Sequence, residues 1–167
     1  QIDQSIDQLN HLLNNLLNWA SAETGSVPFH PQEVDLKGLV EENISLYESL
    51  AKAKGVRLLE DNANTIVFAD VNMMATEIRN LLSNAIKFTR PNSVIKIKLL
   101  KTSERVALSV IDEGEGISES KRAQLFNTDL VSTEGTNSEK GFGLGLKLCR
   151  EFAEKHQGEI KMESQLG

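Results

Sequence analysis

The spacing of hydrophobic residues predicts an amphipathic helix over residues 69–89, and the polar side of this helix is unusual. At about 100° per residue, one broad apolar arc collects six side chains, namely Met74, Ile78, Leu81, Leu82, Ala85 and Ile86. Asn80, Asn84 and Lys87 fall together on the opposite side, with Glu77 close beside them. An amide oxygen can ligate a hard cation, and an ammonium can neutralise phosphate charge. The helix alone leaves two interpretations open, a phosphate and metal site or an ordinary solvated face.

Other parts of the pattern predict further helices and strands in alternation. A helix is expected over residues 39–54, where Asp35 is a good N-cap and Gly55 ends the helix. Another is expected over residues 144–156, and Asp70 caps the helix with the polar side. Short apolar or period-two runs predict strands at residues 56–60, 66–69, 93–101, 105–112 and 159–164.

Two segments between the last strands and helices have different patterns. A short helix is expected to open at Ser118 and to end near Phe126. Residues 127–140 are rich in Ser, Thr and Gly and have no periodicity, which is typical of a mobile lid.

The first segment follows a heptad pattern. Its apolar residues alternate spacings of four and three, at Ile2, Ile6, Leu9, Leu13, Leu16 and Ala20. A helix of this kind needs partner helices, although it could instead fold back on its own domain. Gly25 and Pro28 then end the helix and begin a linker.

Composition excludes several classes of protein. The net charge of −6 and the lack of a basic block argue against a nucleic-acid surface. The single cysteine, Cys149, lies in an apolar helical stretch and is expected in the core, which excludes an internal disulfide. No apolar run approaches membrane-spanning length and no signal-peptide pattern is present, so no direct membrane contact is expected.

A strand pattern ends at Asp112 and is followed by Gly114 and Gly116, which predicts a tight turn where backbone closely approaches another group. A carboxylate at the end of a buried strand needs a donor, and the exocyclic amine of adenine is a suitable one. Asp-x-Gly is also a common turn signal with no ligand.

Downstream, Gly141, Gly143 and Gly145 run directly into a helical pattern. Exposed backbone N–H groups at a helix start form an anion site, and the missing side chains let phosphate come close. A flexible hinge is the alternative.

The order and spacing of these motifs closely resemble those of sensor histidine kinases. The run Asn80 to Thr89, the turn Asp112 to Ile117, the pair Leu125-Phe126 and the run Gly141 to Leu146 match the N, G1, F and G2 boxes of that family in order. The resemblance covers nearly the whole chain. It implies an α/β fold, the two-layer α/β sandwich of the Bergerat ATP-binding type, with a mixed sheet, helices on one face and a coiled-coil-like dimerisation helix in front. No P-loop or His-Arg-Asp loop is present, in agreement.

The resemblance also implies the organisation of the chain. Residues 1–24 would be the second helix of a dimerisation and phosphotransfer hairpin, residues 25–33 a linker, and residues 34–167 the ATP-binding catalytic domain without its last strand. The intact protein would form a homodimer through helix 1–20, and its partner would be the receiver domain of a response regulator. It would be cytoplasmic, either soluble or anchored in the inner membrane.

By resemblance, the nucleotide is ATP or ADP and the metal is Mg²⁺. Asp112 would accept a hydrogen bond from adenine N6, Gly114 and Gly116 would let the base approach, and Ile117 would line its pocket. Phe88 would either stack on the base or lie in the core. Asn84 is the candidate Mg²⁺ ligand. The triphosphate would be held by backbone donors of the glycine-rich run and by a lid cation, that is by Lys140, Gly141, Gly143, Leu144, Gly145 and Leu146.

Asn80 and Lys87 are the predicted catalytic residues. Asn80 would support the phosphate or a metal-bound water, and Lys87 would contact phosphate. Related hydrolysing ATPases carry a glutamate at the place of Asn80, and an amide cannot deprotonate water. This residue and the heptad helix therefore disfavour a chaperone or topoisomerase ATPase. Glu77 could be a base or a solvated neighbour, and we favour the latter.

None of the three histidines has the setting of a phosphoacceptor. His11 lies within the predicted first helix, His30 in the linker, and His156 at a helix end where a cation is favourable. The predicted function is therefore a histidine kinase core whose acceptor histidine lies on an absent upstream helix and passes phosphate to a response-regulator aspartate. The alternative is a regulatory nucleotide-binding and dimerisation module with little turnover. Phe142 departs from the small residue usual between the first two glycines.

Overall fold

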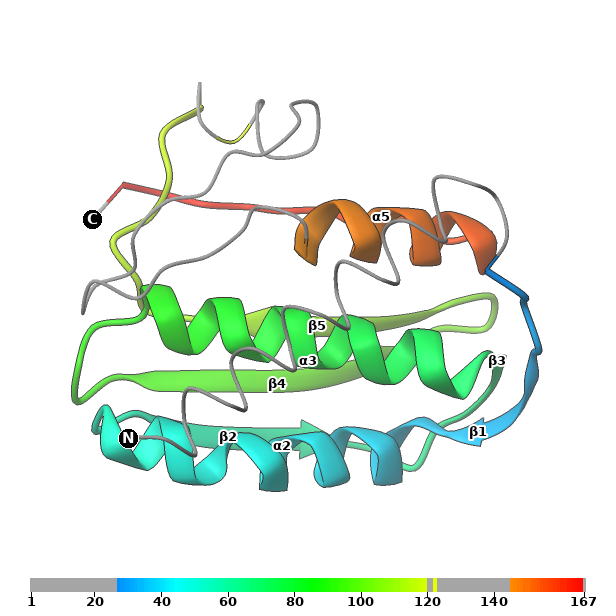
Figure 1. Cartoon of the computed structure of the whole chain (residues 1–167), viewed down its shortest axis with the longest axis horizontal. Coiled ribbons are helices and arrows are strands. Elements are labelled where there is room, and N and C mark those ends of the chain that lie inside the picture. Colours follow the sequence, from blue (N-terminus) through cyan, green and yellow to red (C-terminus); the bar gives the residue numbers. More distant parts are fainter. Residues whose placement is uncertain (1–26, 120–121, 123–144, 167) are drawn as a thin grey trace.

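The computed structural model describes residues 27–119, 122 and 145–166 (Figure 1). The described elements follow one another in the order β1 (Gln32–Asp35), α2 (Leu36–Ala53), β2 (Arg57–Asn62), β3 (Ile66–Ala69), α3 (Val71–Phe88), β4 (Val94–Lys101), β5 (Val106–Ile111) and α5 (Gly145–Lys155).

The larger sheet has the strand order β2-β4-β5, in which β2 and β4 are parallel and β4 and β5 are antiparallel. The helices lie over one face of this sheet (Figure 1). Ile95, Ile97 and Leu99 of β4 are buried, whereas Lys96 between them is exposed. This period of two turns the apolar side chains toward the helices. The mixed sheet with helices on one face confirms the predicted two-layer α/β sandwich.

The core lies between the sheet and two helices. Ile78 and Leu82 of α3 and Val40 of α2 are fully buried and pack with the apolar residues of β4. The predicted apolar arc of α3 is therefore the side that meets the sheet. Met73 of the same helix belongs to a second, smaller cluster with Leu148 and Phe152 of α5.

Helices α3 and α5 run antiparallel, and α5 packs along the N-terminal half of α3 (Figure 1). Gly145 at the start of α5 lies against Asn80. One turn further along α5, Cys149 Sγ lies 3.9 Å from the carbonyl oxygen of Glu77. At the other end, His156 reaches Asp70, the residue before α3. Cys149 is buried, as its sequence setting predicts.

Both long helices begin at a capping aspartate. Asp35 accepts a hydrogen bond from the Gly38 N–H, and Asp70 accepts from the N–H groups of Asn72 and Met73. Capping side chains of this kind satisfy N–H groups that have no partner inside the helix. Both caps agree with the prediction, although α2 begins three residues earlier than expected.

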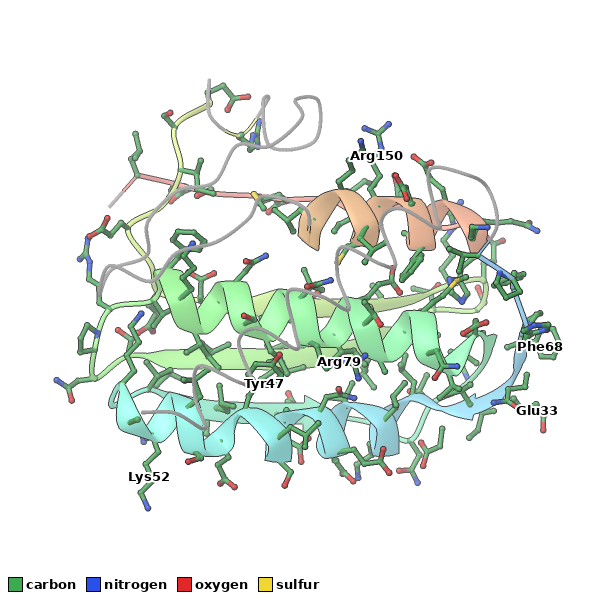
Figure 2. The ribbon with its side chains drawn as sticks, in the orientation of Figure 1. Glu33, Tyr47, Lys52, Phe68, Arg79 and Arg150 are labelled. Carbon is green, nitrogen blue, oxygen red and sulfur yellow. The ribbon has the colours of Figure 1, made fainter. Side chains whose placement is uncertain are left out.

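Two further differences concern strands. The predicted strand at 159–164 is wrong, because residues 158–166 form no strand with any part of the chain that the structure describes. An ion pair of 3.6 Å joins Glu159 of this segment to Arg105, the residue before β5. In addition, β1 begins at Gln32 and pairs antiparallel with β3. The last residues of the predicted linker 25–33 thus belong to a small sheet, at whose edge Glu33 lies opposite Phe68 (Figure 2).

Several predictions fall on residues that the structure does not describe. They are the heptad helix 1–20, most of the short helix after Ser118, the lid 127–140, and the residues Phe126, Lys140, Gly141, Phe142, Gly143 and Leu144. Among the described helices, none has the length and apolar character needed to cross a membrane.

Candidate nucleotide site

The polar side of α3 is not a solvated face. Asn80 is only 4% exposed, and Glu77, Asn84 and Lys87 are half-buried. These four side chains follow one another at intervals of about one turn on a single 18-residue helix. A rigid helix therefore fixes their mutual positions, which a loop would not do.

The start of α5 covers Asn80. A Cβ atom added to Gly145 would lie 3.0 Å from Asn80 Oδ1 and 3.3 Å from Asn80 Cγ. A side chain at this position would press against the amide, so glycine favours the close approach of α5 to Asn80. The structure thus brings together one predicted residue of the glycine-rich run and one of the helix. Leu146 follows on α5 and is half-buried.

Glu77 differs most from its expected state. Burial raises the pKa of its carboxyl from 4.5 to about 8. The interpretation as a solvated neighbour is therefore wrong, because α5 packs over this part of α3 and removes water. Near neutral pH, Glu77 is largely protonated and able to donate a hydrogen bond. The helix pattern shows its position but gives no signal of its burial.

At its C-terminal end, α3 meets the predicted adenine turn. Thr89, which follows α3 and is fully buried, forms an antiparallel bridge with Gly114. A Cβ atom on Gly114 would lie 2.9 Å from the Phe88 carbonyl oxygen. Two motifs about 25 residues apart in sequence thus share one end of the fold.

Asp112 lies at this end, on the exposed surface of the turn. Its Oδ1 accepts a 2.8 Å hydrogen bond from the Gly114 N–H, the one partner that the described residues give its side chain. Although the residue is exposed, desolvation of its carboxyl by the surrounding turn raises the pKa of Asp112, and the Gly114 hydrogen bond opposes this rise. One carboxylate oxygen is therefore held by the turn while the other can accept from a ligand.

The C-terminal segment supports the far side of the turn. Gly116 has a φ of +73°, and a Cβ atom there would collide with the Gln165 carbonyl. The Ile117 N–H donates to Ser164 Oγ at 2.8 Å. The positive φ and the nearby Gln165 carbonyl thus explain the glycine at position 116. The predicted reason was a different one, the approach of an adenine base.

Lys87 and Phe88 form a pair at the end of α3. The Lys87 ammonium lies 4.7 Å from the centroid of the Phe88 ring, a cation–π distance. Phe88 is half-buried and belongs to neither described apolar cluster. Its predicted role as a core residue is therefore disfavoured, whereas stacking on a ligand stays a prediction.

A buried lysine supports this end of α3. Lys54, the C-cap residue of α2, is 9% exposed, and its Nζ donates to the carbonyl oxygens of Ile86 and Lys87 at 2.7 Å each. These carbonyls have no acceptor role inside the helix, and a cation is favourable at a helix C-terminus. Sequence reasoning missed this contact, because Lys54 lies 32 residues away from Ile86 in the chain.

The described residues contain no group of three or more His, Cys, Asp or Glu side chains that could hold a metal alone. Mg²⁺ is commonly held by one or two protein oxygens together with phosphate oxygens and water. The Asn84 amide, half-buried on the polar side and one turn from Asn80, is suited to that limited role. The donor set thus fits an ion that arrives with a nucleotide.

Residues 69–167, more than half of the chain, match the family described as histidine kinase-, DNA gyrase B-, and HSP90-like ATPase. The chain belongs to this family. Adaptive-response sensory kinase SasA of Crocosphaera subtropica is 32% identical over 159 residues, which are 93% of this chain and 41% of that protein. The chain spans less than half the length of the curated relatives it matches.

Solved structures agree with this assignment. The catalytic domain of histidine kinase ThkA has a TM-score of 0.67 and 28% identity, covering 75% of this chain and 81% of that one. Full-length ShkA in complex with AMPPNP has a TM-score of 0.74 and 25% identity, covering 90% of this chain and 32% of that one. The predicted resemblance to sensor histidine kinases is confirmed.

Proposed function

We propose that the chain is the ATP-binding catalytic part of a sensor histidine kinase. In the intact protein it would transfer the γ-phosphate of ATP to a histidine of the dimerisation hairpin, for relay to a response-regulator receiver domain. One observation carries the proposal: a single helix, α3, joins the Asn80–Gly145 contact to the Thr89–Gly114 bridge. The helix would then fix the distance between the phosphate-binding residues and the adenine-binding residues. Such positioning matters because phosphoryl transfer needs mainly positioning and charge neutralisation.

The residues would divide the work as follows. Asp112 would accept from the adenine amine through the oxygen that Gly114 does not use. Lys87 would neutralise phosphate charge, and Asn80 would hold a phosphate or a metal-bound water. Mg²⁺, when bound with the nucleotide through Asn84, would neutralise phosphate charge. The AMPPNP in the similar ShkA structure supports an adenine nucleotide as the ligand.

Calorimetric titration with ADP and with Mg-ATP tests the adenine assignment. Asp112→Asn should weaken binding at least about tenfold, because an amide can present a donor where a directed acceptor is needed. Glu115→Gln is the matched control, since it makes the same change on an exposed residue of the same turn and should leave affinity unchanged. Equal affinities of the Asp112→Asn variant and the wild type would rule out the adenine role of this residue.

A further inference from the structure

One aspartate holds together three parts of the chain far from the nucleotide site. The first part is the lead-in segment, residues Val27–Pro31, which comes directly before β1. The His30 N–H donates to Asp70 Oδ2 at 2.9 Å, across 40 residues of sequence. The other oxygen, Oδ1, caps α3 by accepting from Asn72 N–H and Met73 N–H at 3.0 and 3.1 Å.

The backbone of Asp70 is also engaged. Its N–H donates to His156 Nε2 at 2.9 Å. A backbone N–H can only donate, so Nε2 carries the lone pair and the proton is on Nδ1, which lies 2.8 Å from the Phe152 carbonyl oxygen. The ring therefore bridges α5 to the start of α3 through both of its nitrogens. His156 thus lies at the end of α5, where the sequence places it, and its ring hydrogen-bonds a carbonyl of the last turn of that helix.

The lead-in segment is held by α5 as well. The Phe29 ring packs edge-on to His156 with centroids 5.0 Å apart. Lys155 Nζ donates to the Val27 carbonyl at 3.1 Å, and Val27 packs against the cluster of Met73, Leu148 and Phe152. Figure 1 shows the lead-in passing the end of α5 on its way to β1.

A helix cap does not explain this arrangement. Asn or Ser caps a helix about as well as Asp does, but only a carboxylate offers two acceptor oxygens without a donor. Asp70 is 5% exposed, so each of its hydrogen bonds is shielded from water. Burial tends to raise the pKa of Asp70, yet the N–H groups of His30, Met73 and Asn72 outweigh it and the pKa is lowered. The charged, acceptor-only form is the one that the fold favours.

Both helices that meet at this junction lead to the candidate nucleotide site. From Asp70, α3 reaches Asn80 after ten residues, roughly 15 Å at 1.5 Å per residue. From His156, α5 runs back to Gly145, which lies against the same Asn80. The lead-in segment is thus tied to the two elements that carry the phosphate-binding residues.

We propose that Asp70, with His156 and Lys155, forms a junction that fixes the lead-in segment, and hence the helix expected before it, relative to the nucleotide site. Asp70, His156 and Lys155 are then positioning residues for phosphoryl transfer to the upstream histidine. This inference rests on the proposed kinase function. It assigns the junction no part in nucleotide binding, because its residues lie at the opposite end of α3 from Gly114.

Asp70→Asn separates the two tasks of this residue. The asparagine amide can still cap α3, but whichever way it turns, an NH₂ group faces either His30 N–H or the cap donors. Asp35→Asn is the matched control, since it is the same change at the cap of α2, where the described partner is Gly38 N–H alone. Lys155→Met is a milder second variant that releases the other end of the lead-in.

Amide hydrogen exchange of this chain reads the junction directly. In Asp70→Asn, the His30 amide should exchange about tenfold faster, the effect of losing one hydrogen bond of ~1.4 kcal/mol, while Asp35→Asn leaves it unchanged. ADP affinity should stay within about twofold of wild type in all three variants, since none touches the nucleotide residues.

Phosphorylation is measured in the intact protein at saturating ATP. Asp70→Asn and Lys155→Met should slow histidine labelling about tenfold to a hundredfold, because small errors in placement at a distance have effects of this size. An unchanged labelling rate, an equally protected His30 amide, or a matching loss of ADP affinity would each overturn the proposal. Failure of the wild type to bind adenine nucleotides would instead overturn the kinase function, and the exchange experiment would still decide whether the junction forms.

Discussion

At the scale of single residues, burial changes the chemistry of Glu77. Its pKa is about 8 in the folded chain and near 4.5 when exposed. The folded state therefore binds a proton more tightly than the unfolded state, so stability falls as pH rises from about 4.5 to about 8. At pH 7 the free energy of unfolding is lower than at acidic pH by on the order of 3 kcal/mol, because the carboxyl ionises in the unfolded chain but stays protonated in the fold.

Glu77→Gln should remove this dependence. Glutamine has the size of the protonated acid and no charge to desolvate, so the variant should melt higher than wild type at pH 8 and close to it at pH 5. Thermal denaturation at both pH values measures the difference. Glu42→Gln, on the exposed surface of α2, is the control and should leave the wild-type pH slope in place. Identical slopes for the wild type and Glu77→Gln would contradict the burial argument.

Asn84 is the residue on which the metal prediction depends. Asn84→Ala should reduce the magnesium-dependent tightening of nucleotide binding about tenfold or more, since even the loss of a supporting contact near a metal has that effect. Affinity for adenosine should not change, because the methyl group removes an oxygen ligand and nothing at the adenine turn. Titrations with and without Mg²⁺ measure this, with Ser83→Ala as the neighbouring control on α3. If the full magnesium effect remains, Asn80 or Glu77 holds the ion.

At the scale of elements, the end of α3 depends on a residue of α2. Lys54→Met removes both hydrogen bonds to the Ile86 and Lys87 carbonyls, which should lower the free energy of unfolding by about 2 kcal/mol. Because Lys87 sits in the freed turn, ATP affinity should fall more than adenosine affinity. Lys54→Arg keeps a cation with several donors and should recover much of the ATP preference. Equal losses for ATP and adenosine would mean that Lys54 acts on stability alone.

Elements with strong local patterns were predictable from the sequence. The strand at 66–69 and both capped helices have the expected places, because alternation, caps and Gly55 are local signals. The early start of α2 was missed since Gly38 in its first turn lowers helix propensity, and the Asp35 cap overcomes this. β1 was missed because Val34 is its only apolar residue, and it exists through pairing with β3.

The parts of the candidate site that could be predicted are those that form motifs of defined residue types and spacing along the chain. Asn80, Asn84, Lys87 and Asp112 were proposed as site residues from the sequence, and their roles remain predictions. What the sequence could not give is contact between distant segments: α5 covering Glu77, Lys54 reaching α3, and His156 meeting Asp70 across 86 residues. The first of these contacts changes the protonation state of Glu77, and the other two hold the ends of α3. None of them produces a periodic pattern in the sequence.

At the scale of the whole molecule, the described histidines are poorly placed to accept phosphate from this site. Both ring nitrogens of His156 are engaged, with the Asp70 N–H and the Phe152 carbonyl. His30 is exposed, but its backbone is tied to Asp70. Asn84 lies fourteen residues beyond Asp70 along α3, which is a distance of roughly 20 Å. In-line transfer needs the nucleophile at close range, about 3 Å from the phosphorus.

The chain alone should therefore remain unlabelled with radioactive ATP, yet donate phosphate in trans. A longer chain of the same protein that contains the upstream hairpin but carries Asp112→Asn serves as acceptor, because it cannot use its own nucleotide site. Mixing the two should place acid-labile label on the longer chain, provided that transfer can occur between subunits. The same mixture with Asp112→Asn in both chains should give none. Stable label on the shorter chain, mapped to His11, His30 or His156, would contradict the separation of the ATP site from its acceptor.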